Sequence, residues 1–526
     1  MLNRYLFAAT VFLFSCTTPA DNSKNSMTDS YEFIKSETQL GSPAPDASQV
    51  PHTTEIHGLK LEDPYFWMRL SDEQKEADTP DEQTTNVIDY LNKENDYKDK
   101  VLAPTVQLQE ELYEEIIGRI VKDDESVPVK YRGYWYYSRF EEGNEYAFNC
   151  RKKGSMVADE EIMLNGPELA KGHNYFSISG ASVSPNNELL VYGVDTVSRR
   201  QYTLYFKNLV TGELFEDQIP ETNGGAVWAN DNKTIFYTKN DPQTLRSYRV
   251  YKHVLGTSAS EDVIVYEETD ETFYIGVGKS KSQEFIMISS NSTLSTETRY
   301  IKADRPNSEW TVVLPRETDH EYGVSHYGEH FYIHTNKEAK NFKLVKTPIG
   351  NTSEEVWEDV IPHRDDVLLE GTDFFSSHLV ISERKEGLNQ IRIIKWDGAE
   401  DYYLEFSDPA YSAFTGANPD YESEVLRFGY TSLTTPYTTY EHNFGDRRRK
   451  QLKQQKVLGG KFDPANYTSE RIMVEARDGV KVPVSIVYHK DIKLGDNTPL
   501  LLYAYGSYGA SMDPGFSSTR LSLLDR

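Results

Sequence analysis

Cysteine is nearly absent from this sequence of 526 residues, which contains only Cys16 and Cys150. Two cysteines exclude a disulfide framework and a zinc site built on thiolates. Cys150 lies in an alternating, strand-like run (EYAFNCRKK) and is expected to be a packed structural residue. Positive charge is also scarce, because 56 lysines and arginines face 83 aspartates and glutamates, a net charge of −27 at pH 7. Such a field repels phosphate backbones, so we expect no nucleic-acid partner, and it attracts cationic ligands.

Several catalytic and cofactor motifs are missing as well. There is no G-x-S-x-G motif, since Tyr505 rather than glycine stands two places before Ser507. No H-E-x-x-H motif and no glycine-rich phosphate loop occur, so no cofactor is expected. His326, His330 and His334 recur every four residues, but no carboxylate or cysteine completes a metal set. We therefore predict no metal site and interpret these as surface histidines.

Long apolar runs are absent, apart from ten residues near the start. A basic Arg4 precedes the run from Tyr5 to Phe14, which is too short to span a bilayer. This pattern predicts a signal peptide over residues 1–15. The run ends in Leu-Phe-Ser-Cys16, which resembles the lipobox of bacterial lipoproteins. The resemblance implies lipidation of Cys16 and an exported bacterial protein, anchored by lipid on the periplasmic side or the cell surface. Ordinary secretion with an incidental cysteine is the alternative.

Residues 16–50 are rich in serine, threonine, asparagine, aspartate and proline, which predicts a tether rather than a folded segment. Residues 51–125 form the next part, with two helices expected between 80 and 121 on either side of Pro104. In the second helix apolar residues recur every four positions, which indicates one apolar face: Leu108, Leu112, Ile116 and Ile120.

From Val127 onward the pattern changes to short aromatic and β-branched runs separated by turns. One kind of run recurs seven times, beginning at residues 133, 189, 234, 284, 330, 378 and 425. The spacing is near 48 residues, which leaves room for four short strands in each copy. We therefore predict a mainly β protein with a seven-bladed β-propeller over residues 126–452. An array of β-sandwiches is the alternative.

After Gln451 the pattern changes again. Glu470–Ala476 and Lys481–His489 alternate on either side of an Asp-Gly turn, which predicts a hairpin. Pro499–Tyr505 is a continuous apolar run, typical of a strand buried on both faces of an α/β sheet. Residues 453–526 are therefore expected to begin a second, α/β domain.

Together these features resemble the prolyl oligopeptidase family of serine peptidases, and most closely its oligopeptidase B branch. The resemblance covers residues 57–526. Glu62–Arg69 resembles the family's N-terminal signature, and the most specific stretches are Ala476–Ser485 and Tyr505–Ala510. It implies an incomplete α/β-hydrolase domain over residues 453–526 and an N-terminal helical segment that packs on it. It also implies that the propeller admits short peptides and excludes folded proteins.

The resemblance implies roles for two residues. Tyr505 matches the family tyrosine whose hydroxyl stabilises the oxyanion. Asp513 matches one of two acidic residues that hold a basic substrate side chain, whereas the second position is Gly515. The serine, aspartate and histidine of the triad are expected beyond Arg526, so this chain by itself is predicted to be inactive.

Three hypotheses follow. The first is a lipid-anchored serine oligopeptidase that cleaves short, basic peptides after arginine or lysine. The second is a non-catalytic propeller lipoprotein that binds peptides or partners. The third is a post-proline oligopeptidase of the same family. The oligomeric state stays open in all three.

Overall fold

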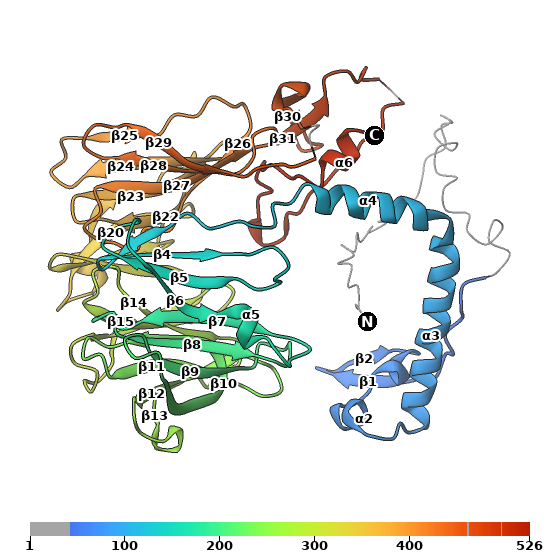
Figure 1. Ribbon diagram of the computed structural model, residues 1–526, viewed down its shortest axis with the longest axis horizontal. Helices are drawn as coiled ribbons and strands as arrows, with labels where there is room; N and C mark the ends of the chain where they lie inside the picture. Colours follow the sequence, from blue (N-terminus) through green and yellow to red (C-terminus); the bar gives the residue numbers. More distant parts are fainter. Residues whose placement is uncertain (1–42, 460–461, 496) are drawn as a thin grey trace. The chain divides into compact units, whose positions relative to one another are not determined.

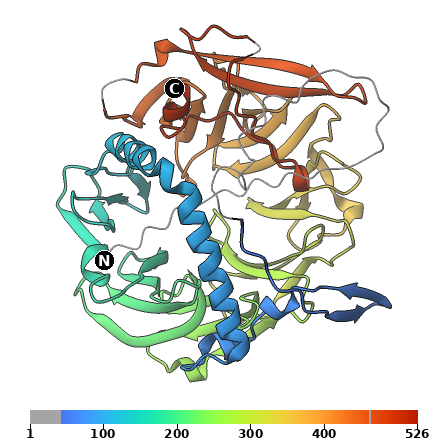
Figure 2. The same ribbon diagram turned by 90° about the vertical axis from the view of Figure 1, so that its right-hand side faces the viewer.

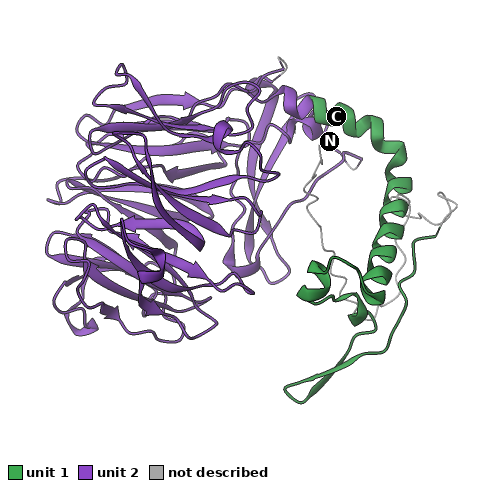
Figure 3. Ribbon diagram, turned by 60° about the horizontal axis from the view of Figure 1, so that its bottom comes forward, with its two compact units in different colours: residues 1–114 green, residues 115–526 purple. Residues whose placement is uncertain are grey.

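The structure is a computed structural model that describes residues 43–459, 462–495 and 497–526. The chain divides into two compact units, residues 1–114 and residues 115–526 (Figure 3). The predicted signal peptide and the lipidation site at Cys16 lie outside the described residues.

The first element in the described part of this unit is a hairpin of β1 (Thr53–Ile56) and β2 (Leu59–Glu62). Two short helices follow, η2 (Phe66–Met68) and α2 (Asp72–Glu76), and then α3 (Glu82–Leu102). The Asp81 side chain caps α3 by accepting a hydrogen bond from the Thr84 amide.

Pro104 lies in the first turn of η3 (Ala103–Thr105), after which α4 (Val106–Gly118) crosses into the second unit. The two predicted helices are confirmed. No helix in the described ranges is both long and apolar enough to cross a membrane.

The second unit contains five sheets of four antiparallel strands (Figure 1). Their strands are β3 (Val129–Tyr131), β4 (Tyr134–Arg139), β5 (Phe148–Lys153), β6 (Glu160–Asn165); β14 (Tyr274–Lys279), β15 (Phe285–Asn291), β16 (Thr296–Lys302), β17 (Thr311–Leu314); β18 (Tyr322–Tyr327), β19 (His330–Thr335), β20 (Lys343–Pro348), β21 (Glu358–Ile361); β22 (Val367–Phe374), β23 (His378–Lys385), β24 (Leu388–Lys395), β25 (Asp401–Tyr403); and β26 (Tyr411–Thr415), β27 (Val425–Ser432), β28 (Thr438–Asn443), β29 (Arg449–Gln454). In Figure 2 these sheets follow one another around a ring, as the blades of a β-propeller do.

A sixth sheet has seven strands. It consists of β7 (Ser177–Val183), β8 (Leu189–Asp195), β9 (Tyr202–Asn208), β10 (Leu214–Trp228), β11 (Thr234–Asn240), β12 (Ser247–Val254) and β13 (Val263–Glu267). Short helical segments join the strands at α5 (Gly166–Leu169), η4 (Ala259–Glu261) and η5 (Glu354–Val356).

The predicted propeller is confirmed, but the predicted count of seven separate blades is wrong. All seven recurring runs are strands: β4, β8, β11, β15, β19, β23 and β27. Within the described ranges, however, only five of them lie in four-stranded blades, because β10 runs for 15 residues without a break. Its first half pairs with β9 and its second half with β11, so two copies of the repeat share one sheet.

The core of the propeller lies between the faces of successive sheets. One cluster joins Ile391 and Ile393 of β24 to Leu426 and Phe428 of β27. Another joins Phe236 of β11 to residues of β15 in the next sheet. Each blade therefore buries its apolar faces against its neighbours, which explains why near-continuous apolar runs mark its second strand.

The first and last blades meet through a buried arginine. Arg427 of β27 donates to the Pro128 carbonyl oxygen over 2.8 Å and pairs with Glu441 over 2.7 Å. Its side chain is almost fully buried, so this contact ties the beginning of the propeller to its end.

The C-terminal region confirms the predicted hairpin and corrects the predicted strand. After η6 (Pro464–Asn466), β30 (Tyr467–Glu475) pairs with β31 (Lys481–His489) around Gly479, whose φ is +84°. Pro499–Tyr505 forms no strand, and Leu500–Tyr503 are 68–82% exposed. A strand buried on both faces needs hydrogen-bonded neighbours, and the described residues after 454 supply only the hairpin. Two short helices complete this region, η7 (Ser507–Gly509) and α6 (Leu521–Leu524).

Candidate functional site

Tyr505, the predicted oxyanion donor, ends the exposed apolar segment and is separated from η7 by Gly506. Its side chain is 56% exposed, and its hydroxyl makes no hydrogen bond within the described part of the chain. The next turn is unusual, because Tyr508 adopts a left-handed backbone conformation with φ of 58°. The role of Tyr505 in stabilising an oxyanion stays a prediction.

Asp513, the predicted substrate-binding residue, is ion-paired within the chain. Arg384 of β23 donates from both terminal nitrogens to the two oxygens of Asp513, over 2.5 and 3.1 Å. The Nε atom of Arg384 donates to Glu370 of β22 over 2.6 Å. Sequence analysis missed Arg384, because 129 residues separate it from Asp513 and no local motif marks it.

Two cavities are lined by strands of the propeller blades. The first has a volume of about 530 Å³, and its lining includes Arg132, Gln283 and Lys279. The second has a volume of about 420 Å³, and its lining includes Lys281 and Asp373, whose charged atoms are 2.5 Å apart. Burial lowers the pKa of Lys279 to about 8. These volumes suit a few amino-acid residues rather than a folded chain.

The three histidines that recur every four residues do not form a site. His326 is buried, so its interpretation as a surface residue is wrong: its ring nitrogens bond to Ser282 Oγ and to the Gly328 carbonyl oxygen. His334 bonds to the carbonyl oxygen of Leu369. Burial lowers the pKa of both rings, which favours their neutral forms.

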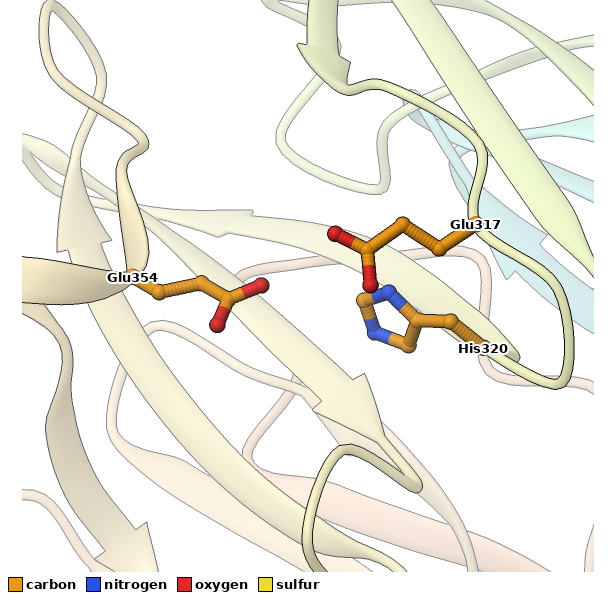
Figure 4. Close-up of side chains that lie close together, drawn as sticks. All are labelled: Glu317, His320 and Glu354. Atoms are coloured by element: carbon orange, nitrogen blue, oxygen red, sulfur yellow. The ribbon is translucent and has the colours of Figure 1, made fainter.

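One cluster in the described residues has ligand types suited to a metal. Figure 4 shows that Glu317, His320 and Glu354 converge, with one ligand atom of each within 4.8 Å of the others. The ammonium group of Lys337, however, lies 2.6 Å from Glu317 and 3.2 Å from Glu354. Because the ammonium group of Lys337 already pairs with both carboxylates, it occupies the place that a cation would take between them.

The shortest histidine–carboxylate contact among the described residues is also not a catalytic site. His253 Nδ1 lies 2.7 Å from Asp262, which also accepts a hydrogen bond from the Tyr237 hydroxyl over 2.8 Å. The His253 side chain is fully buried, so no peptide can reach it. We assign this trio to the packing of the seven-stranded sheet.

Known proteins resemble this chain over most of its length. The sequence profile for the prolyl oligopeptidase N-terminal β-propeller domain matches residues 45–455. Dipeptidyl aminopeptidase BI of Pseudoxanthomonas mexicana is 43% identical, with 94% of this chain and 69% of that protein covered. Protease 2 of Moraxella lacunata is 32% identical, with 92% and 68% covered.

The fold agrees with these sequence matches. The structure of oligopeptidase B from Leishmania major superposes with a TM-score of 0.84 at 33% identity, covering 92% of this chain and 70% of that one. The family profile, the sequence matches and the structural superposition thus all point to peptidases of one family. The chain therefore belongs to the prolyl oligopeptidase family of serine peptidases.

Proposed function

We propose that this chain is part of a serine oligopeptidase that hydrolyses short peptides after arginine or lysine. The observation that chiefly supports this is the likeness to oligopeptidase B of Leishmania major, at 33% identity and a TM-score of 0.84 over 92% of the chain. The net charge of −27 adds support, because it favours the approach of cationic peptides. In this proposal residues 453–526 begin an α/β-hydrolase domain, and the catalytic triad comes from residues that are not among these 526.

The propeller acts in this proposal as a size filter. Cavities of about 530 and 420 Å³ between its strands hold short peptides and exclude folded proteins. Tyr505 donates a hydrogen bond to the oxyanion that forms when the peptide carbonyl is attacked. A fixed donor there is worth about 3–4 kcal/mol, because its hydrogen bond strengthens as negative charge develops.

A second candidate activity is the release of dipeptides from the amino terminus of a peptide. It is favoured by one specific observation: the relative at 43% identity is named a dipeptidyl aminopeptidase. The two candidates differ in one requirement, since release of dipeptides needs a free substrate amino group whereas endopeptidase action does not.

The first test compares fluorogenic peptides on the native protein purified from its own cells, after its intact mass has been measured. We expect cleavage of amino-blocked peptides that end in arginine or lysine, and none of matched peptides that end in proline. Cleavage of arginyl dipeptides only when their amino group is free would select the second candidate. Preference for proline would overturn the proposed specificity, and no cleavage of any peptide would favour the non-catalytic propeller lipoprotein.

A serine-directed fluorophosphonate probe tests where the nucleophile lies. We expect the probe to label the native protein and to leave the purified 526-residue chain unlabelled. Labelling of a serine within the 526 residues would refute the proposed source of the triad.

We also propose that Cys16 carries a lipid that anchors the protein on the periplasmic side of a membrane or on the cell surface. The support is the Leu-Phe-Ser-Cys16 sequence that ends the apolar run. Metabolic labelling with palmitate should mark the wild-type protein and not the Cys16→Ser variant. Equal release of both proteins into the medium would refute the anchor.

A further inference from the structure

The environment of Arg384 is that of a bound ligand rather than a surface ion pair. Its guanidinium group donates to Asp513 through both terminal nitrogens, to Glu370 through Nε, and to the Gly387 carbonyl oxygen over 3.2 Å. The Arg384 side chain is only 13% exposed. Paired, bidentate contacts of this kind are the strongest that a guanidinium group makes with carboxylates.

The two carboxylates come from different parts of the chain. Glu370 lies on β22, and its second oxygen accepts a hydrogen bond from Asn389 Nδ2 over 3.0 Å, which fixes its orientation. Asp513 lies in the C-terminal region, 129 residues after Arg384. Together they form a guanidinium cage, by which we mean the space between the carboxylates of Glu370 and Asp513.

The cage lies where the C-terminal region meets the propeller. Next to Asp513, the Phe516 amide donates to Thr431 Oγ1 of β27 over 3.0 Å. On the other side, Arg471 of β30 donates to the Glu386 carbonyl oxygen in the turn after β23. Of these contacts, only those of Arg384 with Asp513 pair two full charges, so they contribute most to fastening the segment.

We propose that Arg384 is a built-in occupant of this guanidinium cage. It fastens residues 513–516 to the blade β22–β25 and withholds Asp513 from the cationic side chain of a peptide. A peptide that carries a guanidinium group competes with Arg384 for the same two carboxylates. Arg384 is thus a specificity-determining residue that weakens selection for a second basic residue in the substrate. The part of this proposal that concerns peptides rests on the proposed function, whereas the cage itself does not.

Hydrogen exchange in the 526-residue protein tests the cage without any need for catalysis. The Phe516 amide is the reporter, because its hydrogen bond to Thr431 depends on the fastened segment. In Arg384→Ala we expect this amide to exchange about tenfold faster, since charge-assisted hydrogen bonds are lost. Ethylguanidinium, which replaces the missing end of the side chain, should restore slow exchange, and ethylammonium should not.

Two variants serve as controls. Arg392→Ala removes a comparable arginine on β24, which pairs with Asp401 over 2.7 and 2.5 Å, and should leave the Phe516 amide unchanged. Asp513→Asn should accelerate exchange as Arg384→Ala does, but ethylguanidinium should not rescue it. Unchanged exchange in Arg384→Ala would refute the role of Arg384 in fastening the segment. Failure of ethylguanidinium to restore slow exchange would refute the binding of a guanidinium group between Glu370 and Asp513. If Arg384→Ala fails to fold, the exchange rate of the Phe516 amide in Asp513→Asn tests the fastening role by itself.

Peptide kinetics on the native protein test the specificity role. We compare kcat/KM for two peptides that differ only in having arginine or alanine immediately before the residue at which cleavage occurs. Arg384→Ala should raise the arginine-to-alanine ratio of kcat/KM about tenfold relative to wild type, and an unchanged ratio would overturn this role. Absence of all cleavage would count against the proposed function. The hydrogen-exchange results would still show whether Arg384 occupies the guanidinium cage.

Discussion

An oxyanion donor must be held still, and Tyr505 is not held in this structure. The residue is 56% exposed, and the residues before it form no strand. Preorganisation is what makes such a donor effective, because a mobile hydroxyl has to be ordered during the reaction. If Tyr505 has its proposed role, its contribution therefore depends on neighbouring elements that hold the hydroxyl in place.

The Tyr505→Phe substitution tests this role in the native protein. We expect kcat to fall by about 10²–10³-fold with little change in KM, because the hydrogen bond strengthens only in the transition state. Tyr503→Phe, two residues earlier and also exposed, is the matched control and should retain wild-type kcat. Equal effects of both substitutions, or a change confined to KM, would show that Tyr505 does not act on the oxyanion.

Cys150 is the buried thiol of the described chain, as its alternating sequence context predicts. It packs with Tyr137 and Phe148, and burial is the main cause that raises its pKa to about 11. In a Cys16→Ser background, we expect a thiol reagent at pH 8 to label Cys150 only as fast as the protein unfolds. In denaturant, labelling should be immediate. Rapid labelling of the native protein would contradict the burial of this thiol.

At the scale of elements, three glycines explain how one strand serves two repeats. Gly224 lies in β10 with φ of +90°, within the register shift between Thr222 and Ala226 in the pairing with β11. A Cβ atom there would lie 2.7 Å from Cγ of Tyr202, and one at Gly193 would lie 2.6 Å from the Gly224 Cα. Gly180 also packs against the Gly224 backbone. Such close approach of three backbone segments requires residues without side chains.

Gly224→Ala should therefore destabilise the propeller by about 2–4 kcal/mol, because it combines backbone strain with overpacking. Gly276→Ala in β14 is the control, since a Cβ at Gly276 meets no atom within 4 Å and its φ is not left-handed. That variant should be neutral or more stable by up to ~1 kcal/mol. Denaturant midpoints measured by tyrosine and tryptophan fluorescence compare the two. Equal midpoints would contradict the crossing of backbones at β10.

At the scale of the whole molecule, the propeller and the exposed C-terminal segment differ in how far their apolar side chains are shielded from solvent. The blades bury their apolar faces against one another, whereas Leu500, Leu501 and Leu502 are 71–82% exposed. Burial of one such side chain contributes about 1.5–3 kcal/mol to the free energy of unfolding. The exposed segment lacks this stabilisation, whereas the blades have it.

Brief chymotrypsin digestion should therefore cut first between residues 500 and 508, which contain exposed leucines and tyrosines. We expect a stable product that retains the propeller, with its new end identified by mass spectrometry. Tyrosines of the blades, such as Tyr237 and Tyr322, are buried and should remain uncut. Simultaneous cleavage in the blades would show that the propeller is not the more stable part.

The sequence by itself determined the repeating unit of this protein. Seven similar runs, two helices around Pro104 and a hairpin around Gly479 all follow from local periodicity and turn chemistry, which depend on neighbours in sequence. The specific stretch around Tyr505 indicates the family from sequence alone. A short motif can indicate a family because it specifies both a backbone conformation and particular side chains within a few residues.

Only the tertiary structure decided how these units combine. The fusion of two repeats through β10 depends on glycines from three strands, and the pairing of Arg384 with Asp513 joins residues 129 positions apart. The apolar run before Tyr505 reads as a strand, yet a strand needs partners on its edges that local sequence does not supply. Contacts between distant segments are set by packing and charge in three dimensions, so no pattern along the chain encodes them.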